Sequence, residues 1–346
     1  MKAKITIYDL SEELKLAPST ISKVINGKGK VSETTRKRVL KYIDEIGYVP
    51  NNSARMLKSG RSYMIGVIFS EELSIGLEHP FFSSILQHFK TYVESFGYEL
   101  SFIVSKLGKH KLSYYEWCVN KKVDGVYIVV GDHKDNGMIE LAKKNIPIVS
   151  TDIILDGVKT IVSNNEEGIN LAMEHFYKST TEIGIITGPL HSKAFKDRYE
   201  AYIDFLHKNN ININKDYIIE SESFGFTSGY NACLKLMKQA KKMPKALIVG
   251  SDEIAVGVLK CLNDHNIKIP EEIEVIGFDD NVYSRYVTPS LSTIAQNKVE
   301  IGSLAAKYLL DMIENKAKIN NITKVGVELI HRESTKNNWN RFHFVL

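Results

Sequence analysis

The chain has 346 residues, of which 43% are hydrophobic and 25% are charged, and its formal net charge is +4. This balance is typical of a globular protein, and the length predicts two or three domains. There is no apolar run of the roughly 18 residues that a membrane helix needs. The opening MKAKITIYDLSEEL also lacks the apolar core of a secretory signal. We therefore expect a cytoplasmic protein with no membrane partner.

The three cysteines, Cys118, Cys233 and Cys261, are far apart in the chain. Their number and spacing predict neither a disulfide framework nor a metal-binding pair. Buried reduced thiols are the expected state. The sequence gives no reason to expect a metal ion or a cofactor.

Positive charge is concentrated at the start of the chain. Residues 1–60 contain 12 Lys/Arg and 6 Asp/Glu, which gives +6, so the remaining residues carry −2. A basic segment on a nearly neutral body is expected of a module that binds nucleic-acid phosphates. An ordinary solvated charged surface would give the same skew, so charge alone leaves both interpretations open.

The first elements predict a DNA-binding head. Residues 6–14 are expected to form a short helix, and residues 15–17 a tight turn. A second helix over 18–26 opens at Pro18, which suits a first helical turn because its missing N–H would be unpaired there. Two short helices joined in this way form a helix-turn-helix, whose second helix lies in the DNA major groove. Residues 31–51 supply a third helix, which we expect Pro50 to end.

After a polar connector at residues 51–62, short apolar runs alternate with helical patterns. The expected strands are 64–69, 98–104, 123–130, 146–151, 183–187, 217–220, 246–249 and 274–278. The expected helices are 81–96, 111–121, 137–144, 165–178, 196–208, 227–240 and 253–265. This alternation predicts an α/β fold with two doubly wound parallel-sheet lobes. Ligands bind beyond the carboxyl ends of such strands, so two facing lobes would enclose a small molecule.

Several stretches resemble the lactose-repressor/galactose-repressor (LacI/GalR) family of bacterial transcription regulators. In the head the resemblance covers residues 17–62. In the body it covers HPFF (79–82), VDGVYIV (123–129), GSDEIAVGVLKCL (250–262), VIGFDDN (275–281), TPSLSTIAQ (288–296) and HREST (331–335). These stretches follow the family's order along nearly the whole chain. The resemblance implies a helix-turn-helix head (1–50), a hinge helix (51–62) and a core like the periplasmic sugar-binding proteins (63–346). It places one core lobe at about 63–162 with 293–325, and the other at about 163–292 with 326–346.

The resemblance also implies a homodimer that binds a near-palindromic DNA operator. In it, Pro18, Ser19 and Lys23 face base edges. A lysine can donate to guanine O6 and N7, which is worth about 1–3 kcal/mol of discrimination. The alternative for Lys23 is a sequence-independent phosphate contact. The candidate DNA-binding residues are Thr6, Pro18, Ser19, Thr20, Ser22, Lys23, Asn26, Asn51, Ala54, Leu57 and Lys58.

Two residues of the head depart from the family pattern. Ala17 stands where many members have a serine helix cap, and Lys15 where many have glycine. Loss of the cap hydroxyl costs about 1 kcal/mol of helix stability. We do not expect either change to prevent DNA binding.

In the family, the hinge segment becomes helical when the dimer sits on DNA, and a leucine wedges into the minor groove. Leu57 matches that position, and Ala54 lies one turn before it. Such wedges kink DNA at a cost of a few kcal/mol per step. The alternative is that Leu57 packs against the core of its own subunit. An effector that separates the paired hinge segments would release DNA.

By resemblance, Arg198 reaches the effector, Asp152 and Asp279 accept sugar hydroxyls, and Phe224 packs on the ligand. Buried hydroxyl groups need such partners. These aspartates could instead cap turns, which is the interpretation we favour for Asp280. The candidate effector-binding residues are Ser70, Phe81, Phe82, Asp152, Arg198, Phe224, Ser251, Asp252, Asp279 and Gln296. The segment 70–82 is longer than usual, which puts Ser70 in doubt.

The leading prediction is a sugar-responsive repressor of carbohydrate-utilisation genes. The stretch 191–194 lacks the Arg and Thr of purine-responsive members, which disfavours a purine co-repressor. A global catabolite regulator with a phosphorylated carrier protein as co-effector remains an alternative. The usual zinc, nucleotide and acyl-transfer motifs do not occur, so we do not expect an enzyme. The basic head disfavours an extracytoplasmic sugar receptor, and the tail after Thr335 has no heptad repeat for tetramerisation.

Overall fold

The computed structural model describes residues 5–25, 29–48, 60–69, 77–103, 106–107, 110–315 and 321–336. Contacts divide the chain into two compact units, residues 1–63 and 64–346. Of the predicted site residues, Asn26, Asn51, Ala54, Leu57, Lys58 and Ser70 lie outside the described residues, as do Pro50 and the tail after residue 336.

The first unit contains the three predicted helices, α1 (Ile7–Leu14), α2 (Pro18–Ile25) and α3 (Glu33–Ile46). Each helix buries an apolar stripe in a shared core that includes Leu10, Ile21 and Val39, all 0% exposed. Arg38 on α3 donates to the carbonyl of Leu14. Such tertiary contacts are necessary because isolated helices this short are marginal in water.

Capping residues determine where these helices begin and end. Thr6 and Asp9 form a reciprocal capping box at the start of α1, which satisfies amide groups that lack a helical partner. Lys15 ends α1 in the left-handed conformation, with φ 50°. The third helix ends at Gly47, with φ 64°, and not at Pro50 as predicted. Glycine adopts this conformation without a side-chain clash, so it ends the helix before the proline is reached.

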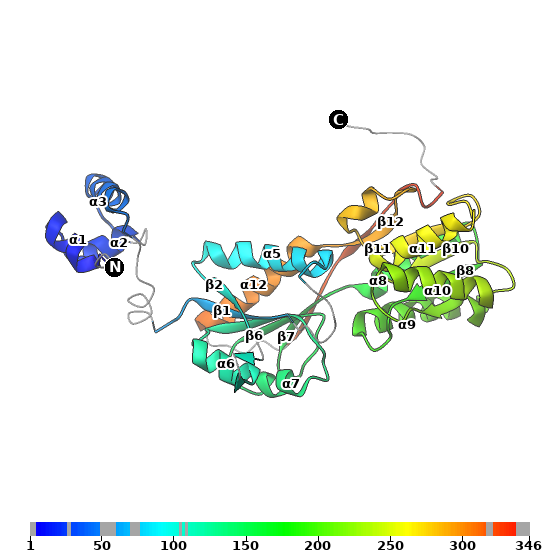
Figure 1. Ribbon diagram of the computed structural model, residues 1–346, viewed down its shortest axis with the longest axis horizontal. Coiled ribbons are helices and arrows are strands. Elements are labelled where there is room, and N and C mark those ends of the chain that lie inside the picture. The colour runs from blue at the N-terminus through cyan, green and yellow to red at the C-terminus, as the bar shows by residue number, and fades with distance from the viewer. Residues whose placement is uncertain are drawn as a thin grey trace. The chain divides into compact units, whose positions relative to one another are not determined.

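The second unit contains two six-stranded sheets (Figure 1). The first sheet is fully parallel, in the order β13-β7-β6-β5-β1-β2. Its strands are β1 (Met64–Phe69), β2 (Glu99–Phe102), β5 (Gly125–Val130), β6 (Ile148–Thr151), β7 (Lys159–Ser163) and β13 (Ile322–Val325). Its helices are α5 (Pro80–Ser95), α6 (Tyr114–Lys121), α7 (Asn136–Ala142) and α12 (Lys298–Asn315). Helices α5 and α12 lie together on one face, and α6 and α7 lie on the other (Figure 1). A small antiparallel pair, β3 (Lys106–Leu107) and β4 (His110–Lys111), is separate from both sheets.

The second sheet has the order β14-β12-β11-β10-β8-β9, and only β14 is antiparallel to its neighbour. Its strands are β8 (Ile183–Thr187), β9 (Ile218–Glu220), β10 (Ala246–Val249), β11 (Glu274–Asp279), β12 (Ser292–Gln296) and β14 (Val327–Ile330). Its helices are α8 (Asn165–Tyr177), α9 (Lys193–Lys208), α10 (Phe226–Gln239) and α11 (Asp252–Asp264), with short 3-10 turns η2 (Lys215–Tyr217) and η3 (Val282–Arg285).

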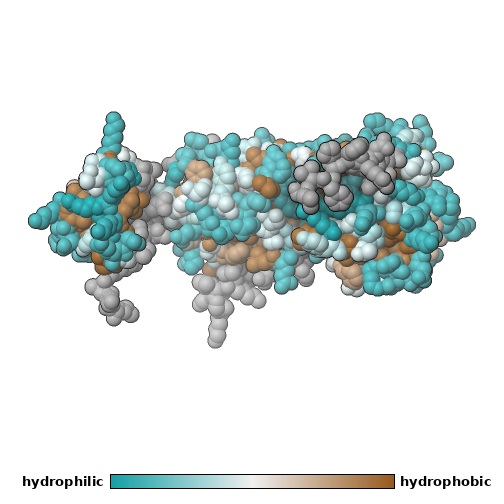
Figure 2. All heavy atoms as spheres, turned by 90° about the horizontal axis from the view of Figure 1, so that it is seen from above, coloured by the Kyte–Doolittle hydropathy of each residue, from teal (hydrophilic) through white to brown (hydrophobic). Residues whose placement is uncertain are grey.

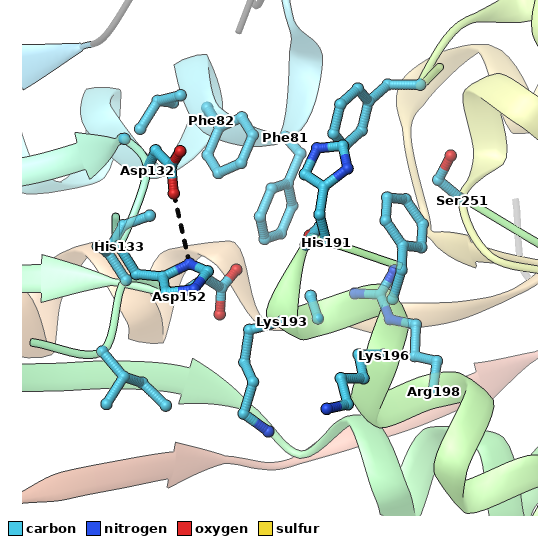
Figure 3. A pocket seen from close by; sticks show the side chains of 18 of the residues that line it. Phe81, Phe82, Asp132, His133, Asp152, His191, Lys193, Lys196, Arg198 and Ser251 are labelled. Atoms are coloured by element: carbon cyan, nitrogen blue, oxygen red, sulfur yellow. Dashed lines mark ion pairs between the residues drawn. The ribbon is translucent and has the colours of Figure 1, made fainter. Parts of the chain in front are cut away.

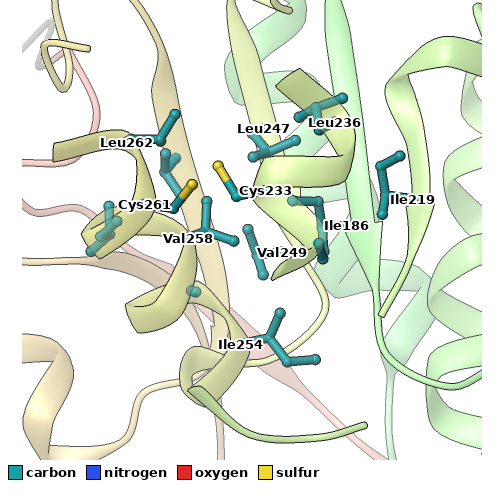
Figure 4. Packing of buried hydrophobic residues seen from close by; sticks show 14 of the residues in the cluster. Ile186, Ile219, Cys233, Leu236, Leu247, Val249, Ile254, Val258, Cys261 and Leu262 are labelled. Carbon is teal, nitrogen blue, oxygen red and sulfur yellow. The ribbon is translucent and has the colours of Figure 1, made fainter. Parts of the chain in front are cut away.

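Alternate residues of the central strand β10 pack on opposite faces of this sheet. Leu247 and Val249 join the cluster formed with α10 and α11, whereas Ala246 and Ile248 join the cluster formed with α8 and α9. Cys233 and Cys261 belong to the first of these clusters (Figure 4), and all three cysteines of the chain are free and buried. Burial on both faces is characteristic of parallel sheets covered by two helical layers.

The chain passes between the two lobes three times: from β7 to α8, from β12 to α12 and from β13 to β14. The predicted boundary at residue 293 would have split β12. The structure instead pairs the whole of β12 with β11 and β14 in the second sheet. The chain therefore leaves the second lobe only after Gln296, because the hydrogen bonds between β12 and its neighbouring strands extend to that residue.

The face of the protein in Figure 2 carries mainly hydrophilic side chains, with hydrophobic residues in separate small patches. Among the described residues, no helix is long and apolar enough to cross a membrane.

Candidate functional site

The helix-turn-helix presents part of the predicted DNA-binding set at its surface. On α2, Ser19 and Lys23 are exposed, while Pro18, Thr20 and Ser22 are half-buried. Ile21 and Val24 on the opposite side of this helix are buried in the head core. The helix therefore presents a polar face that carries one lysine, which is the type of surface that reads base edges and phosphates.

Thr6, which was predicted only as a DNA contact, caps the first turn of α1. Its backbone amide donates to the carboxylate of Asp9 over 2.6 Å, and its hydroxyl donates to the same carboxylate over 2.8 Å. These bonds hold the first turn of α1 and lower the pKa of Asp9. A DNA contact by Thr6 would have to coexist with this capping box.

In the second unit, a cavity of about 500 Å³ lies between the two lobes, and we call it the effector cleft. Its walls come from residues at or just after the carboxyl ends of strands, and from the first turns of α5 and α9. Eight of the predicted effector residues line it: Phe81, Phe82, Asp152, Arg198, Phe224, Ser251, Asp279 and Gln296. Carboxyl ends of parallel strands are where this fold class binds ligands, because the strands and their loops converge there.

Arg198 is a buried residue in the wall of the cleft (Figure 3), and three contacts hold its side chain. Its Nε donates to Oδ1 of Asn165 over 2.8 Å, and its Nη1 donates to the carbonyl of Gly250 over 2.6 Å. The guanidinium also lies 3.6 Å from the ring centre of Phe278. Because these contacts fix its plane before any ligand arrives, little side-chain entropy is lost on binding.

Asp152 and Asp279 bring two carboxylates to the same cleft. Burial raises the pKa of Asp152 to about 6, although nearby Arg198 opposes the shift. Burial also raises the pKa of Asp279, against the effects of Arg198 and Lys298. Their backbones have positive φ angles of 57° and 125°, which are unfavourable for side-chain-bearing residues. Strain of this kind is concentrated at ligand sites, where the surrounding fold imposes it.

Asp252, which the sequence analysis placed with the effector residues, does not line the cleft. Its carboxylate is fully buried and accepts three hydrogen bonds: from the amide of Asn281 at 2.8 Å and from the hydroxyls of Ser284 and Thr293 at 2.6 Å each. These bonds tie α11 to the segment that follows β11, to η3 and to the start of β12. Asp252 therefore supports the cleft wall, and we leave it out of the effector-binding set.

Asp280 also lies outside the cleft, but its carboxylate forms ion pairs and is not seen in the turn-capping role that the sequence favoured. Its carboxylate pairs with Arg332 at 2.5 Å and with Arg285 at 3.1 Å. Although it follows Asp279 directly, it does not line the cleft.

The structure adds polar residues that the sequence analysis did not select. They are His79, Asp132, His133, Lys134, His191, Ser192, Lys193 and Lys196. Asp132, His133 and Lys134 follow β5 directly, so the strand-end rule could have identified them. In Figure 3, Asp132 pairs with His133, with Oδ1 and Nδ1 3.5 Å apart. Lys193 and Lys196 each pair with an acidic residue four positions later on α9.

His79 connects the two lobes. It precedes α5 in the first lobe, and its Nε2 lies 3.6 Å from Oε2 of Glu253 on α11 in the second lobe. Nδ1 of His79 and Oε1 of Gln296 are buried without a hydrogen-bond partner among the described residues. Such groups call for an explanation, and a ligand or water in the cleft would supply the missing partners.

Comparison with known proteins identifies both units. Residues 6–51 match the bacterial regulatory proteins of the lacI family, and residues 174–335 match the periplasmic binding protein-like domain. The HTH-type transcriptional repressor PurR of Aliivibrio salmonicida is 30% identical over 95% of this chain and 98% of its own length. This chain belongs to the lacI family. It is therefore a DNA-binding transcription regulator and not an enzyme, which confirms the predicted class and fold.

Two further similarities cover nearly the whole chain. The ribose operon repressor of Haemophilus influenzae is 31% identical over 90% of this chain and 92% of its own length. The crystal structure of the lac repressor dimer bound to operator and the anti-inducer ONPF has a TM-score of 0.76 at 24% identity. The alignment with that structure covers 96% of this lacI-family chain and 99% of the lac repressor chain.

Proposed function

We propose that this lacI-family protein is a cytoplasmic repressor of carbohydrate-utilisation genes, and that a small sugar bound in the effector cleft releases or modulates its operator binding. The observation that carries the proposal is the convergence of Asp152, Asp279 and the fixed Arg198 on one aromatic-lined cleft.

This combination suits a polyhydroxyl ring. A sugar presents hydroxyl groups around its edge and apolar C–H groups on its faces. Two carboxylates accept from hydroxyls, while a guanidinium and the amide of Gln296 can donate to ring and hydroxyl oxygens. Phe81 and Phe82 from one lobe and Phe224 from the other offer flat apolar surfaces to the ring faces. The cleft would then select the sugar whose hydroxyl groups pair with all of its buried polar side chains, because a sugar that leaves one of them unpaired binds more weakly.

Assembly and DNA recognition follow from the family. The lac repressor structure is a dimer on its operator, and we infer the same state for this chain, with α2 of each head in the major groove of one half-site. Two-fold symmetry of the protein then requires a near-palindromic operator. A regulator of this kind acts where the chromosome is, which supports the cytoplasmic location.

Binding between lobes gives the effector a physical means of control. A sugar that contacts both walls stabilises the lobe arrangement that closes on it, and only a differential affinity for two arrangements can change DNA binding. The connector between head and core carries the effect in this proposal. The ribose operon repressor among the relatives supports a sugar as effector.

The decisive experiment measures thermal unfolding of the purified protein against sugars, sugar phosphates and purines. A ligand at 100 times its dissociation constant stabilises the folded protein by about 2.7 kcal/mol. We expect a hit among the sugars, which then changes affinity for operator DNA in a titration. The variant Asp279→Ala is the control and should lose the shift. No hit among small molecules would contradict the proposal and favour the phosphorylated carrier protein as co-effector.

A further inference from the structure

A second cavity adjoins the effector cleft. It measures about 370 Å³ and lies beside the passages between the lobes. Its walls are the end of β7 and start of α8, the strand β13, and one face of α9. Asp197, Glu200 and Asp204 supply that face, because residues three and four apart lie on one side of a helix.

The two cavities share part of their walls. Asp152, Ile154, Lys193 and Ala194 line both. Each cavity lies within the range of about 300–1,000 Å³ that is usual for ligand pockets. Asp152 and Lys193 are thus part of the wall of both ligand-sized spaces, and Figure 3 shows both side chains in the effector cleft.

The second cavity has a surplus of acidic side chains in its wall. Five carboxylate side chains line it, against the two lysines Lys193 and Lys324. Lys193 pairs with Asp197, and Nζ of Lys324 lies 3.9 Å from Oε2 of Glu166. No positive charge is therefore in excess among the described lining residues, and a phosphate or carboxylate group would meet repulsion. Hydroxyl groups would find acceptors instead.

Ser163 provides an independent sign of a missing polar partner. It lies in the wall of the second cavity and is 3% exposed, and its hydroxyl has no hydrogen-bond partner among the described residues. Its oxygen is inaccessible in the present rotamer, and a change of χ1, which leaves the backbone in place, would be needed for a ligand to reach it. An unsatisfied buried hydroxyl is costly, and a polar ligand in this cavity would relieve that cost.

We propose that the effector is an uncharged oligosaccharide of at least two sugar units, with one unit in the effector cleft and the next in the second cavity. This inference rests on the proposed sugar response. The second unit would lie against the β7–α8 passage and against β13, which leads into the β13–β14 passage. The length of the ligand would thereby bear directly on the relative position of the lobes.

The test is calorimetric titration of the full-length protein with series of fixed linkage: glucose, cellobiose and cellotriose; glucose, maltose and maltotriose; galactose and lactose. In the series that binds, we expect the disaccharide to bind at least tenfold more tightly than its monosaccharide. The variant Asp204→Trp places a bulky ring at an exposed position that lines only the second cavity. The variant should remove the difference in affinity between disaccharide and monosaccharide and should leave the monosaccharide affinity unchanged. Unchanged monosaccharide affinity also shows that the variant is folded.

The matched control is His207→Trp, an exposed position on α9 outside both cavities, and it should behave as the unmodified protein. Equal affinity for mono- and disaccharides, or an unchanged difference in Asp204→Trp, would overturn the inference while leaving a sugar response intact. Phosphorylated and uronic counterparts of the disaccharide that binds are titrated in parallel. Tighter binding of either counterpart than of the uncharged disaccharide would overturn the requirement for an uncharged ligand. Binding of no sugar of any length would instead reject the proposed function itself.

Discussion

Gln296 holds the carboxylate of Asp279: its Nε2 donates to Oδ1 of Asp279 over 2.5 Å. The two residues end the neighbouring strands β12 and β11, and Gln296 is the last residue before the chain passes to the first lobe. A side chain at an inter-lobe passage therefore orients a carboxylate of the effector cleft. We therefore expect movement of the lobes and occupancy of the cleft to influence each other at this point.

Replacement of Asp279 by alanine should abolish the effector response while operator binding survives. The change removes a buried hydroxyl acceptor from the cleft and does not touch the head. Operator titrations with and without the sugar measure both effects. Asp280→Ala is the matched control: it breaks the pairs with Arg332 and Arg285, so it should lower stability by about 1–3 kcal/mol but retain the response. A normal response in Asp279→Ala would remove Asp279 from the effector set.

Lys23→Ala should change sequence preference at one base step of each half-site, by about 1–3 kcal/mol. The reason is the exposed position of Lys23 on α2. Selection from randomised operators followed by affinity measurement detects the change. Lys41→Ala is the control, since its side chain is 78% exposed on α3. A uniform loss of affinity for all sequences would show that Lys23 contacts a phosphate instead.

Leu57→Gly tests the predicted minor-groove wedge, which lies outside the described residues. We expect weaker binding to the specific operator, because the kinked DNA would lose the side chain that stabilises it. The thermal midpoint of the core and its sugar affinity should stay unchanged. Operator affinity equal to that of the parent protein would exclude the wedge.

Sugar affinity should fall as the pH is lowered through about 6. Burial raises the pKa of Asp152 to about 6, and hydroxyl donors favour its ionised form. Below that pH, the sugar must displace a proton, which costs up to roughly tenfold in affinity per pH unit. Calorimetry between pH 5 and 8 in buffers of different ionisation enthalpy would show the proton release. Affinity that is flat across this range would contradict the assignment.

The same pKa shift affects stability without ligand. The pKa of Asp152 is raised above 3.8, the usual value for an aspartate. Its contribution to the free energy of unfolding is therefore fully present below pH 3.8. This contribution is lost as the pH rises through about 6. The variant Asp152→Asn should not show this decrease in the free energy of unfolding. Denaturation curves of the variant and of the parent protein between pH 4 and 7 measure the contribution of Asp152.

Gly257→Ala should destabilise the second lobe by about 1–3 kcal/mol. A Cβ at this position would lie 2.0 Å from the carbonyl oxygen of Phe226, so α10 and α11 would have to move apart. Denaturant unfolding measures the change. Gly225→Ala is the control, since a Cβ there meets nothing within 4 Å. Equal stability of both variants would contradict the close approach of the two helices.

The sequence by itself determined the head and the α/β alternation, because those signals are local. Apolar spacing, caps and turn residues lie within a few positions of one another, so α1, α2 and most strands fall within a few residues of their predicted bounds. The order of the resembling stretches likewise determined the family. Two local stop signals lie close together at the end of α3, and Gly47 ends the helix before Pro50 is reached.

The tertiary structure decided what depends on residues far apart in the chain. Local patterns did not predict β7, β13 or β14, and the predicted lobe boundary divided β12. The place of these strands depends on which distant strand each of them pairs with. Asp252 looked like a ligand-binding residue until its partners Ser284 and Thr293 were placed around it. The His79–Glu253 contact and the second cavity arise only where the two lobes meet. Sequence patterns specify elements and faces, whereas the packing of those faces specifies which polar groups remain available to a ligand.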